Sequence, residues 1–128
     1  PLAGRHILVA DDNPFNADIM KDLLDLKGAT CEIASTGQEA VDLFTSSACG
    51  HFDAILMDIR MPDMDGYEAT RRIRHSKHPD HASIMIIATT ANAFADDVKT
   101  TLASGMNAHL SKPVDLDTLC ALLQSMQL

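Results

Sequence analysis

The chain alternates between short apolar runs and segments of helical periodicity, and no linker-like stretch separates them. The apolar runs predict five strands, over residues 6–10, 30–34, 53–58, 84–88 and 108–110. A helix is expected after each strand, over residues 14–27, 37–48, 66–75, 92–103 and 115–126. The chain is therefore expected to consist of five consecutive strand–helix units.

The first, third and fourth apolar runs are almost continuous in Ile, Val, Leu and Met. Such runs are typical of strands buried on both faces, so we predict a parallel sheet between two layers of helices. Because crossovers between parallel strands are right-handed, the expected fold class is a doubly wound α/β domain. The 128 residues, 46% of them hydrophobic, suit one domain over 1–128 with a substantial core. A start at Pro1 is compatible with a segment of a longer protein.

The charge and the cysteine content exclude several classes of partner. With a formal net charge of -8, the surface repels nucleic-acid phosphate, so we expect no direct nucleic-acid binding by this domain. No apolar run approaches the roughly 18 residues of a membrane span, so we expect no membrane insertion. Three cysteines without a secretion signal indicate reduced thiols. This predicts a cytoplasmic location, which includes the cytoplasmic part of a membrane-bound sensor.

Polar residues follow the predicted strands at one end of the sheet. Asp11 and Asp12 follow the first strand, and Asp58 ends the third. Thr90 follows the fourth strand, and Lys112 follows the fifth. In open α/β sheets the ligand site lies beyond the carboxyl ends of the strands. We therefore expect these five side chains to converge on one rim.

The expected convergence of aspartates favours a cation and phosphoryl chemistry. If Asp12 and Asp58 approach within about 4 Å, they repel by about 4 kcal/mol at an effective dielectric near 20, and Asp11 adds to this. A proton or a cation must relieve that repulsion, and oxygen ligands in an open site suit Mg²⁺. A lysine and a hydroxyl on the same rim can hold phosphoryl oxygens, and a carboxylate can itself accept the phosphoryl group.

Four motifs in register resemble one family. The segments ILVADDN, ILMDIRMPDMDG, IIATTANAF and HLSKPV together resemble the receiver domains of two-component response regulators. The DDNPFN stretch, with Asn13 and Asn16, and the short terminus after Gln127 resemble the receivers of hybrid sensor histidine kinases most. The resemblance covers essentially the whole chain. It implies a flavodoxin-like fold, with a five-stranded parallel sheet of order 2-1-3-4-5 and helices on both faces.

The resemblance implies roles for five residues. Asp58 would be the phosphoacceptor, and Lys112 would pair with the phosphoryl group. Asp12 and Asp58 would bind Mg²⁺ directly, with Mn²⁺ as a substitute. The backbone carbonyl of Arg60 would be a third ligand, and Asp11 would act mainly through water.

The resemblance also implies a switch. Thr90 fits the switch position, with Thr89 as the last strand residue. His109 stands where the family usually places Tyr or Phe, and an imidazole can swing inward either neutral or protonated. Arg60 and Asn92 occupy positions that flank the phosphoryl group and would tune its lifetime.

The implied function is a phosphorylation-dependent signalling switch. The phosphoryl group would come from a phosphohistidine on a histidine kinase core or a histidine phosphotransfer domain. Phosphorylation would then shift the surface built from the fourth helix, fifth strand and fifth helix. The domain would catalyse its own phosphotransfer and autodephosphorylation. A stand-alone or transcription-factor response regulator is the alternative to a hybrid-kinase origin.

Particular residues argue against two other functions. A Mg²⁺-dependent hydrolase of the haloacid-dehalogenase kind needs an acid two positions after its nucleophile, where this chain has Arg60. A flavin mononucleotide carrier needs a phosphate-binding loop after the first strand, where Asp11 and Asp12 would repel the phosphate.

Simpler interpretations exist for individual residues. Asn13 and Pro14 are typical of a helix start, a role that leaves the neighbouring aspartates free for other contacts. The histidines of the loop, His75, His78 and His81, have a spacing unsuited to one metal site, so a structural role is expected.

Overall fold

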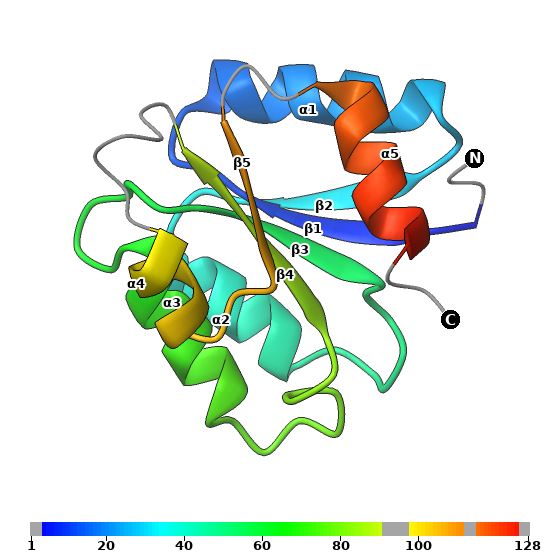
Figure 1. The fold of residues 1–128 in the computed structure, drawn as a ribbon. Coiled ribbons are helices and arrows are strands. Elements are labelled where there is room, and N and C mark those ends of the chain that lie inside the picture. Colours follow the sequence, from blue (N-terminus) through cyan, green and yellow to red (C-terminus); the bar gives the residue numbers. More distant parts are fainter. Residues whose placement is uncertain (1–3, 91–97, 112–114, 126–128) are drawn as a thin grey trace.

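The computed structural model describes residues 4–90, 98–111 and 115–125 (Figure 1). Five strands form one sheet of order β2-β1-β3-β4-β5, and every neighbouring pair is parallel. The strands are β1 His6–Ala10, β2 Thr30–Ala34, β3 Ala54–Asp58, β4 Met85–Thr90 and β5 Ala108–Ser111. The predicted fold class and strand order are therefore confirmed.

Helices cover both faces of the sheet. They are α1 Pro14–Leu26, α2 Gly37–Thr45, α3 Gly66–Arg74, α4 Val98–Ala103 and α5 Leu116–Ser125. Helices α1 and α5 lie on one face, and α2, α3 and α4 lie on the other (Figure 1). The sheet is thus the middle layer of three, as its continuous apolar strands predict.

Each face of the sheet has its own apolar core. In β1, Ile7 and Val9 belong to the core beneath α1 and α5, whereas Leu8 and Ala10 belong to the core beneath α2 and α3. Successive side chains of a strand point to opposite faces, so a strand between two cores must be apolar at every position. This requirement accounts for the near-absence of alternation in the sequence.

The fourth strand ends later than predicted. Thr90 does not follow β4 but is its last residue, and it is preceded in the strand by Thr89, which the resemblance placed last. The ladder continues because Thr89 pairs with Asp58 and Leu110, and Thr90 pairs with Ser111. Both threonines therefore belong to a regular strand at the carboxyl end of the sheet.

The second helix is shorter than predicted, and the predicted start of the fourth is not described. Helix α2 ends at Thr45, three residues before the predicted end. The hydroxyls of Ser46 and Ser47 donate to the carbonyls of Asp42 and Phe44, and these bonds compete with continuation of the helix. The predicted start of the fourth helix, at Asn92, lies outside the described residues.

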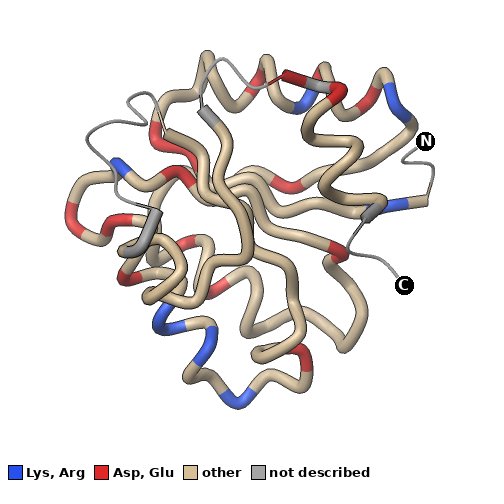
Figure 2. Tube along the Cα trace, viewed as in Figure 1, with Lys and Arg blue, Asp and Glu red and all other residues tan. Residues whose placement is uncertain are grey.

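Charge is distributed unevenly over the fold. Acidic residues gather at the carboxyl ends of β1 and β3, whereas basic residues lie in α3 and in the loop after it (Figure 2). The last turn of α3 holds Arg71, Arg72 and Arg74, where cations favour the helix dipole. None of the described helices is long and apolar enough to span a membrane.

Candidate active site

Three aspartates meet at the carboxyl end of the sheet. Strands β1 and β3 are neighbours, with Ala10 paired to Met57, so the residues that follow both strands lie side by side. One carboxylate oxygen from each of Asp11, Asp12 and Asp58 lies within 4.8 Å of the others. Asp11 and Asp58 are 7% and 3% exposed, whereas Asp12 is exposed to solvent. The predicted convergence of these three residues is thus present.

Backbone hydrogen bonds orient the two buried carboxylates. Asp11 Oδ1 accepts from the backbone N–H of Asn13 at 2.9 Å. Asp58 Oδ1 accepts from the backbone N–H of Arg60 at 3.2 Å, and the next N–H, of Ile59, donates to the carbonyl of Thr89 at 3.1 Å. The carboxylates are therefore held by the turns that end their own strands.

An asparagine, and not an aspartate, caps the first turn of α1. The Asn13 side chain accepts from the backbone N–H groups of Phe15 and Asn16, and Pro14 is the first helical residue. The predicted helix cap is therefore present next to the acidic cluster. The cap and the cluster coexist because the cap uses the amide oxygen of Asn13.

The turn after β3 depends on a glycine beside Asp58. A Cβ atom on Gly66 would lie 2.4 Å from the carbonyl oxygen of Asp58 and 2.9 Å from the Cα of Ile59. The Gly66 N–H donates to the carbonyl of Ile59 at 2.9 Å, and the Asp65 side chain caps α3. The sequence pattern predicts only that a helix begins at Gly66, and does not predict this contact. A glycine can make so close an approach to another backbone because it has no Cβ.

Thr90 and His109 lie on one face of the sheet. Thr90 is completely buried and pairs with Ser111, and His109 pairs with Ala88 in the same ladder. Paired and alternate positions share a face, so the two side chains are diagonal neighbours on adjacent strands. The buried Nε2 of His109 has no hydrogen-bond partner among the residues that the structure describes.

The other predicted site residues are more peripheral or not described. Arg60 is exposed on the loop after β3. The predictions for Lys112 and Asn92 fall on positions outside the described residues.

The histidines of the loop before β4 support the fold. His78 is buried against Phe44, and its Nε2 lies 2.9 Å from the carbonyl of Ser47. His81 Nδ1 lies 2.7 Å from the carbonyl of Arg74. These contacts are those of structural residues, as expected.

The sheet order and the acidic rim define a class, and comparison with known proteins identifies it. Residues 7–124 match the family model of the response regulator receiver domain, and the chain belongs to this family. It is a receiver domain of the two-component type, a phosphotransfer signalling switch. This membership rules out the dehalogenase-type and flavin-carrier interpretations.

Sequence relatives include hybrid kinases. The chain is 40% identical over 113 residues to the sensor histidine kinase RcsC of Escherichia coli (strain K12), which is 88% of this chain and 11% of that protein. It is 38% identical over 126 residues to probable histidine kinase 2 of Oryza sativa subsp. indica, or 90% of this chain and 12% of that protein. The chain thus spans only a small part of the length of these curated relatives.

Two solved structures share the fold over nearly the whole chain. One is the receiver domain of the sensor histidine kinase PA1611 from Pseudomonas aeruginosa PAO1, solved with a magnesium ion in its active site cleft. Its TM-score is 0.85 and its sequence identity is 38%, and the match covers 97% of this chain and 98% of that one. The other is a chain of the Saccharomyces cerevisiae co-crystal structure of the histidine phosphotransfer protein Ypd1 with the receiver domain of its response regulator Ssk1. Its TM-score is 0.81 and its sequence identity is 28%, and the match covers 98% of this chain and 90% of that one.

Proposed function

We propose that Asp58 accepts a phosphoryl group from a phosphohistidine on a partner protein. The observation that carries this proposal is the convergence of Asp58 with Asp11 and Asp12 at the end of β3. In the reaction an oxygen of the Asp58 carboxylate bonds to phosphorus while the bond from phosphorus to the imidazole nitrogen breaks. The partner's phosphoimidazole carries a proton on its other ring nitrogen, so it leaves as neutral imidazole with the electron pair of the broken bond, and Asp58 becomes an acyl phosphate. Later hydrolysis of that acyl phosphate returns the carboxylate.

The acidic cluster fits a divalent cation. Three carboxylate oxygens within 4.8 Å, two of them on buried residues, form a hard-oxygen donor set of the kind that suits Mg²⁺. Asp12 and Asp58 would hold the ion directly, together with the backbone carbonyl of Arg60, and Asp11 would act mainly through water. The ion would supply charge neutralisation, and Mn²⁺ would be able to take its place. The magnesium in the similar PA1611 receiver supports this assignment.

The response to phosphorylation would start at Thr90. Its side chain belongs to the buried end of β4, and Thr89, the preceding residue, pairs with Asp58. Movement of the Thr90 hydroxyl toward the phosphoryl group would leave space on the face that it shares with His109. The His109 ring, neutral or protonated, would follow into that space and change the surface of α4, β5 and α5. Lys112 would complete the phosphoryl pocket.

Residues beside the pocket would set its properties. Arg60 and Asn92 would flank the phosphoryl group and tune the rate of autodephosphorylation. Phe15, 71% exposed at the start of α1, would contact the phosphodonor. Exposed large apolar residues near a site are typical of partner contacts.

The domain would act within a hybrid histidine kinase. The similarity to RcsC and the likeness to the Ssk1 receiver support exchange with a kinase core or a histidine phosphotransfer domain. Residues 1–128 would form one receiver domain in the cytoplasm, without direct contact to nucleic acid. The three cysteines Cys31, Cys49 and Cys120, all of them described residues, are free thiols, which suits a reducing compartment.

Phosphate incorporation tests this proposal. With acetyl phosphate and Mg²⁺, the wild-type chain is expected to gain one acid-labile phosphate, and Asp58→Asn none. Asp63→Asn, which changes an aspartate in the same loop outside the cluster, is the matched control and should retain labelling. Undiminished labelling of Asp58→Asn would place the acceptor elsewhere. Exchange with a phosphorylated histidine phosphotransfer domain then tests the hybrid-kinase origin separately.

A further inference from the structure

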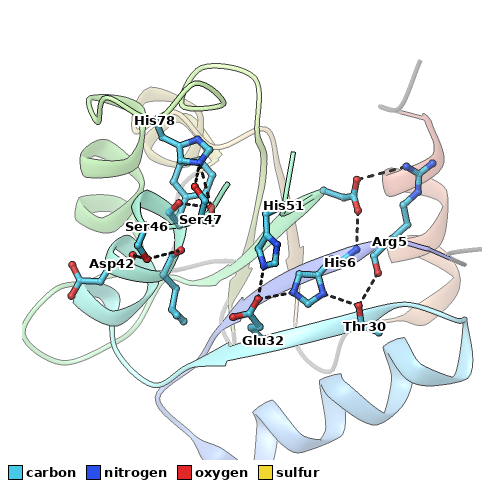
Figure 3. A network of polar contacts seen from close by, with 12 residues as sticks. Arg5, His6, Thr30, Glu32, Asp42, Ser46, Ser47, His51 and His78 are labelled. Atoms are coloured by element: carbon cyan, nitrogen blue, oxygen red, sulfur yellow. Dashed lines mark hydrogen bonds and ion pairs between the residues drawn. The ribbon is translucent and has the colours of Figure 1, made fainter. Parts of the chain in front are cut away.

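A second group of ionisable side chains lies far from Asp58. His6, Glu32 and His51 come from β1, β2 and the loop before β3 (Figure 3). One potential ligand atom from each residue, a ring nitrogen or a carboxylate oxygen, lies within 4.8 Å of the other two. Both Nε2 atoms lie 2.7 Å from the same atom, Glu32 Oε2. The three side chains thus converge on one point.

The sheet register places this cluster. His6 pairs with Thr30, and Leu8 pairs with Glu32, so His6 and Glu32 point to the same face of adjacent strands. That face is the one beneath α2 and α3, since it also carries Leu8. His6 begins β1, whereas Asp11 follows its end, so about 16 Å of strand separates the two groups. The cluster is therefore distinct from the acidic rim.

Neighbouring contacts orient the His6 ring. Its Nδ1 lies 2.7 Å from Thr30 Oγ1, and that hydroxyl donates to the carbonyl of Arg5 at 3.4 Å. Because the hydroxyl proton points to Arg5, Thr30 Oγ1 can accept the Nδ1–H of His6. The ring also stacks on Phe52, with centroids 5.3 Å apart and planes at 10°. In the metal-free chain the Nε2–H donates to Glu32 Oε2, and Thr30 Oγ1 is placed to accept the Nδ1–H once a metal ion replaces the Nε2 proton, as in histidines that bind metals.

The second histidine is held by its loop. The His51 N–H donates to the carbonyl of Ala48 at 3.0 Å, and the next residue, Phe52, is buried. The His51 ring meets Phe52 edge-on, with centroids 4.6 Å apart. The Nε2 atom points to the same Glu32 oxygen as that of His6, and the two imidazole rings meet edge-on with centroids 4.7 Å apart (Figure 3). Nothing in the proposed phosphotransfer chemistry uses these contacts.

We propose that His6, Glu32 and His51 bind a divalent transition-metal ion, with Zn²⁺ as the best match. Two imidazole nitrogens and one carboxylate oxygen form a recurrent three-ligand zinc set, in which water takes the fourth position. Both rings coordinate through Nε2 as neutral imidazoles with the proton on Nδ1. Mg²⁺ prefers an all-oxygen set, so the two sites of the chain select different ions.

The geometry requires only a small adjustment. Tetrahedral Zn²⁺ with bonds of about 2.0–2.1 Å separates its ligand atoms by about 3.3 Å. The 2.7 Å separations from Glu32 Oε2 therefore open by about 0.6 Å when the ion enters. The side chains of His51 and Glu32 are 43% and 38% exposed, and such groups can rotate by this amount. The bound ion would link β1, β2 and the loop before β3, and so stabilise the folded chain.

Zinc titration in the presence of saturating Mg²⁺ tests the proposal. We expect wild-type chain to bind one equivalent at micromolar free Zn²⁺ and to melt at a higher temperature. His51→Ala and Glu32→Gln should each weaken binding by at least about tenfold. His75→Ala removes an exposed histidine outside the cluster, and Asp12→Asn alters the acidic rim, so both should bind as wild type does. Melting curves in EDTA establish that each variant is folded.

Cobalt spectra show whether a cysteine binds the metal ion. Co²⁺ in the proposed site should give tetrahedral bands without a sulfur-to-metal charge-transfer band, because none of the cysteines is a ligand. Wild-type zinc affinity in His51→Ala and Glu32→Gln would overturn the proposal, as would a sulfur band or loss of binding in Asp12→Asn. Failure of the site would leave phosphate incorporation at Asp58 unaffected, so the two proposals can fail separately.

Discussion

The backbone of Gly66 lies against the backbone of Asp58, with no room for a side chain between them. The first turn of α3 is thereby packed directly on the end of β3. This contact positions the loop that carries Arg60, whose N–H donates to the Asp58 carboxylate. The glycine therefore acts on the candidate phosphoacceptor through the backbone.

Gly66→Ala tests this contact. A Cβ at 2.4 Å from the Asp58 carbonyl forces the backbone to move, so we expect the free energy of unfolding to fall by about 1–3 kcal/mol. At an unhindered helical position the same change would stabilise the chain by up to about 1 kcal/mol. Urea denaturation shows whether the free energy of unfolding falls or rises. A more stable variant would show that the close approach is absent.

Asp12→Asn separates repulsion from metal binding. Without Mg²⁺ the exposed Asp12 carboxylate repels Asp11 and Asp58, so the variant should be more stable than wild type by about 1 kcal/mol in EDTA. With Mg²⁺ the order should reverse, because the variant loses a ligand and binds the ion more weakly. Thermal melts with EDTA and with a Mg²⁺ series measure both effects. An order that is the same in both conditions contradicts the cation site.

Arg74 connects three segments through its guanidinium. Nε donates to the carbonyl of Gly105, Nη1 to those of His81 and Ile84, and Nη2 to Asn107 Oδ1. Lysine keeps the charge but loses this planar set of donors and leaves carbonyls without partners. We expect Arg74→Lys to lower the free energy of unfolding by about 2–3 kcal/mol, measured by urea denaturation.

Arg72 provides the matched control in the same helix. It is exposed and its side chain contacts Glu68 at 3.0 Å. Solvent-exposed pairs contribute little, so Arg72→Lys should change stability by no more than about 0.5 kcal/mol. Equal effects at both positions would mean that the Arg74 network has no special role.

Glu32 gives the stability a pH dependence. Hydrogen bonds from His6 and then His51 hold the pKa of its carboxyl below the usual value for glutamate. A lowered pKa in the folded state stabilises the chain above the ordinary glutamate pKa, and this contribution is lost as the pH falls through the lowered value. In EDTA, wild type should exceed Glu32→Gln in stability by no more than about 1 kcal/mol at neutral pH, since the group is partly exposed.

The difference between the two proteins should shrink as the pH falls below about 4. Denaturation at a series of pH values measures this change. A difference that stays constant down to acid pH would show that the Glu32 carboxylate is not stabilised by the two histidines.

The sequence predicted the features that depend on local pattern. Continuous apolar strands followed by aspartates were enough to predict the three layers and the convergence of Asp11, Asp12 and Asp58. The position of Thr90 inside β4 was not predicted, because strand length depends on pairing with β5. The pattern of apolar residues in the sequence does not reveal how far two strands pair.

Contacts between distant residues were the part that local pattern missed. His6 and Glu32 are 26 positions apart, and Glu32 and His51 are 19 apart, so no motif spacing joins them. Only the parallel register and the loop before β3 bring these side chains together. The contact of Gly66 with Asp58 is likewise a property of the folded backbone.

The chemical identity of the phosphorylated residue tests the central claim most directly. After incubation with acetyl phosphate and Mg²⁺, borohydride reduction converts an aspartyl phosphate to homoserine, which peptide mass spectrometry can locate. We predict a single homoserine at position 58, formed only when the divalent ion is present. Homoserine at another aspartate, or phosphate retained on a histidine or a hydroxyl group, would contradict the account.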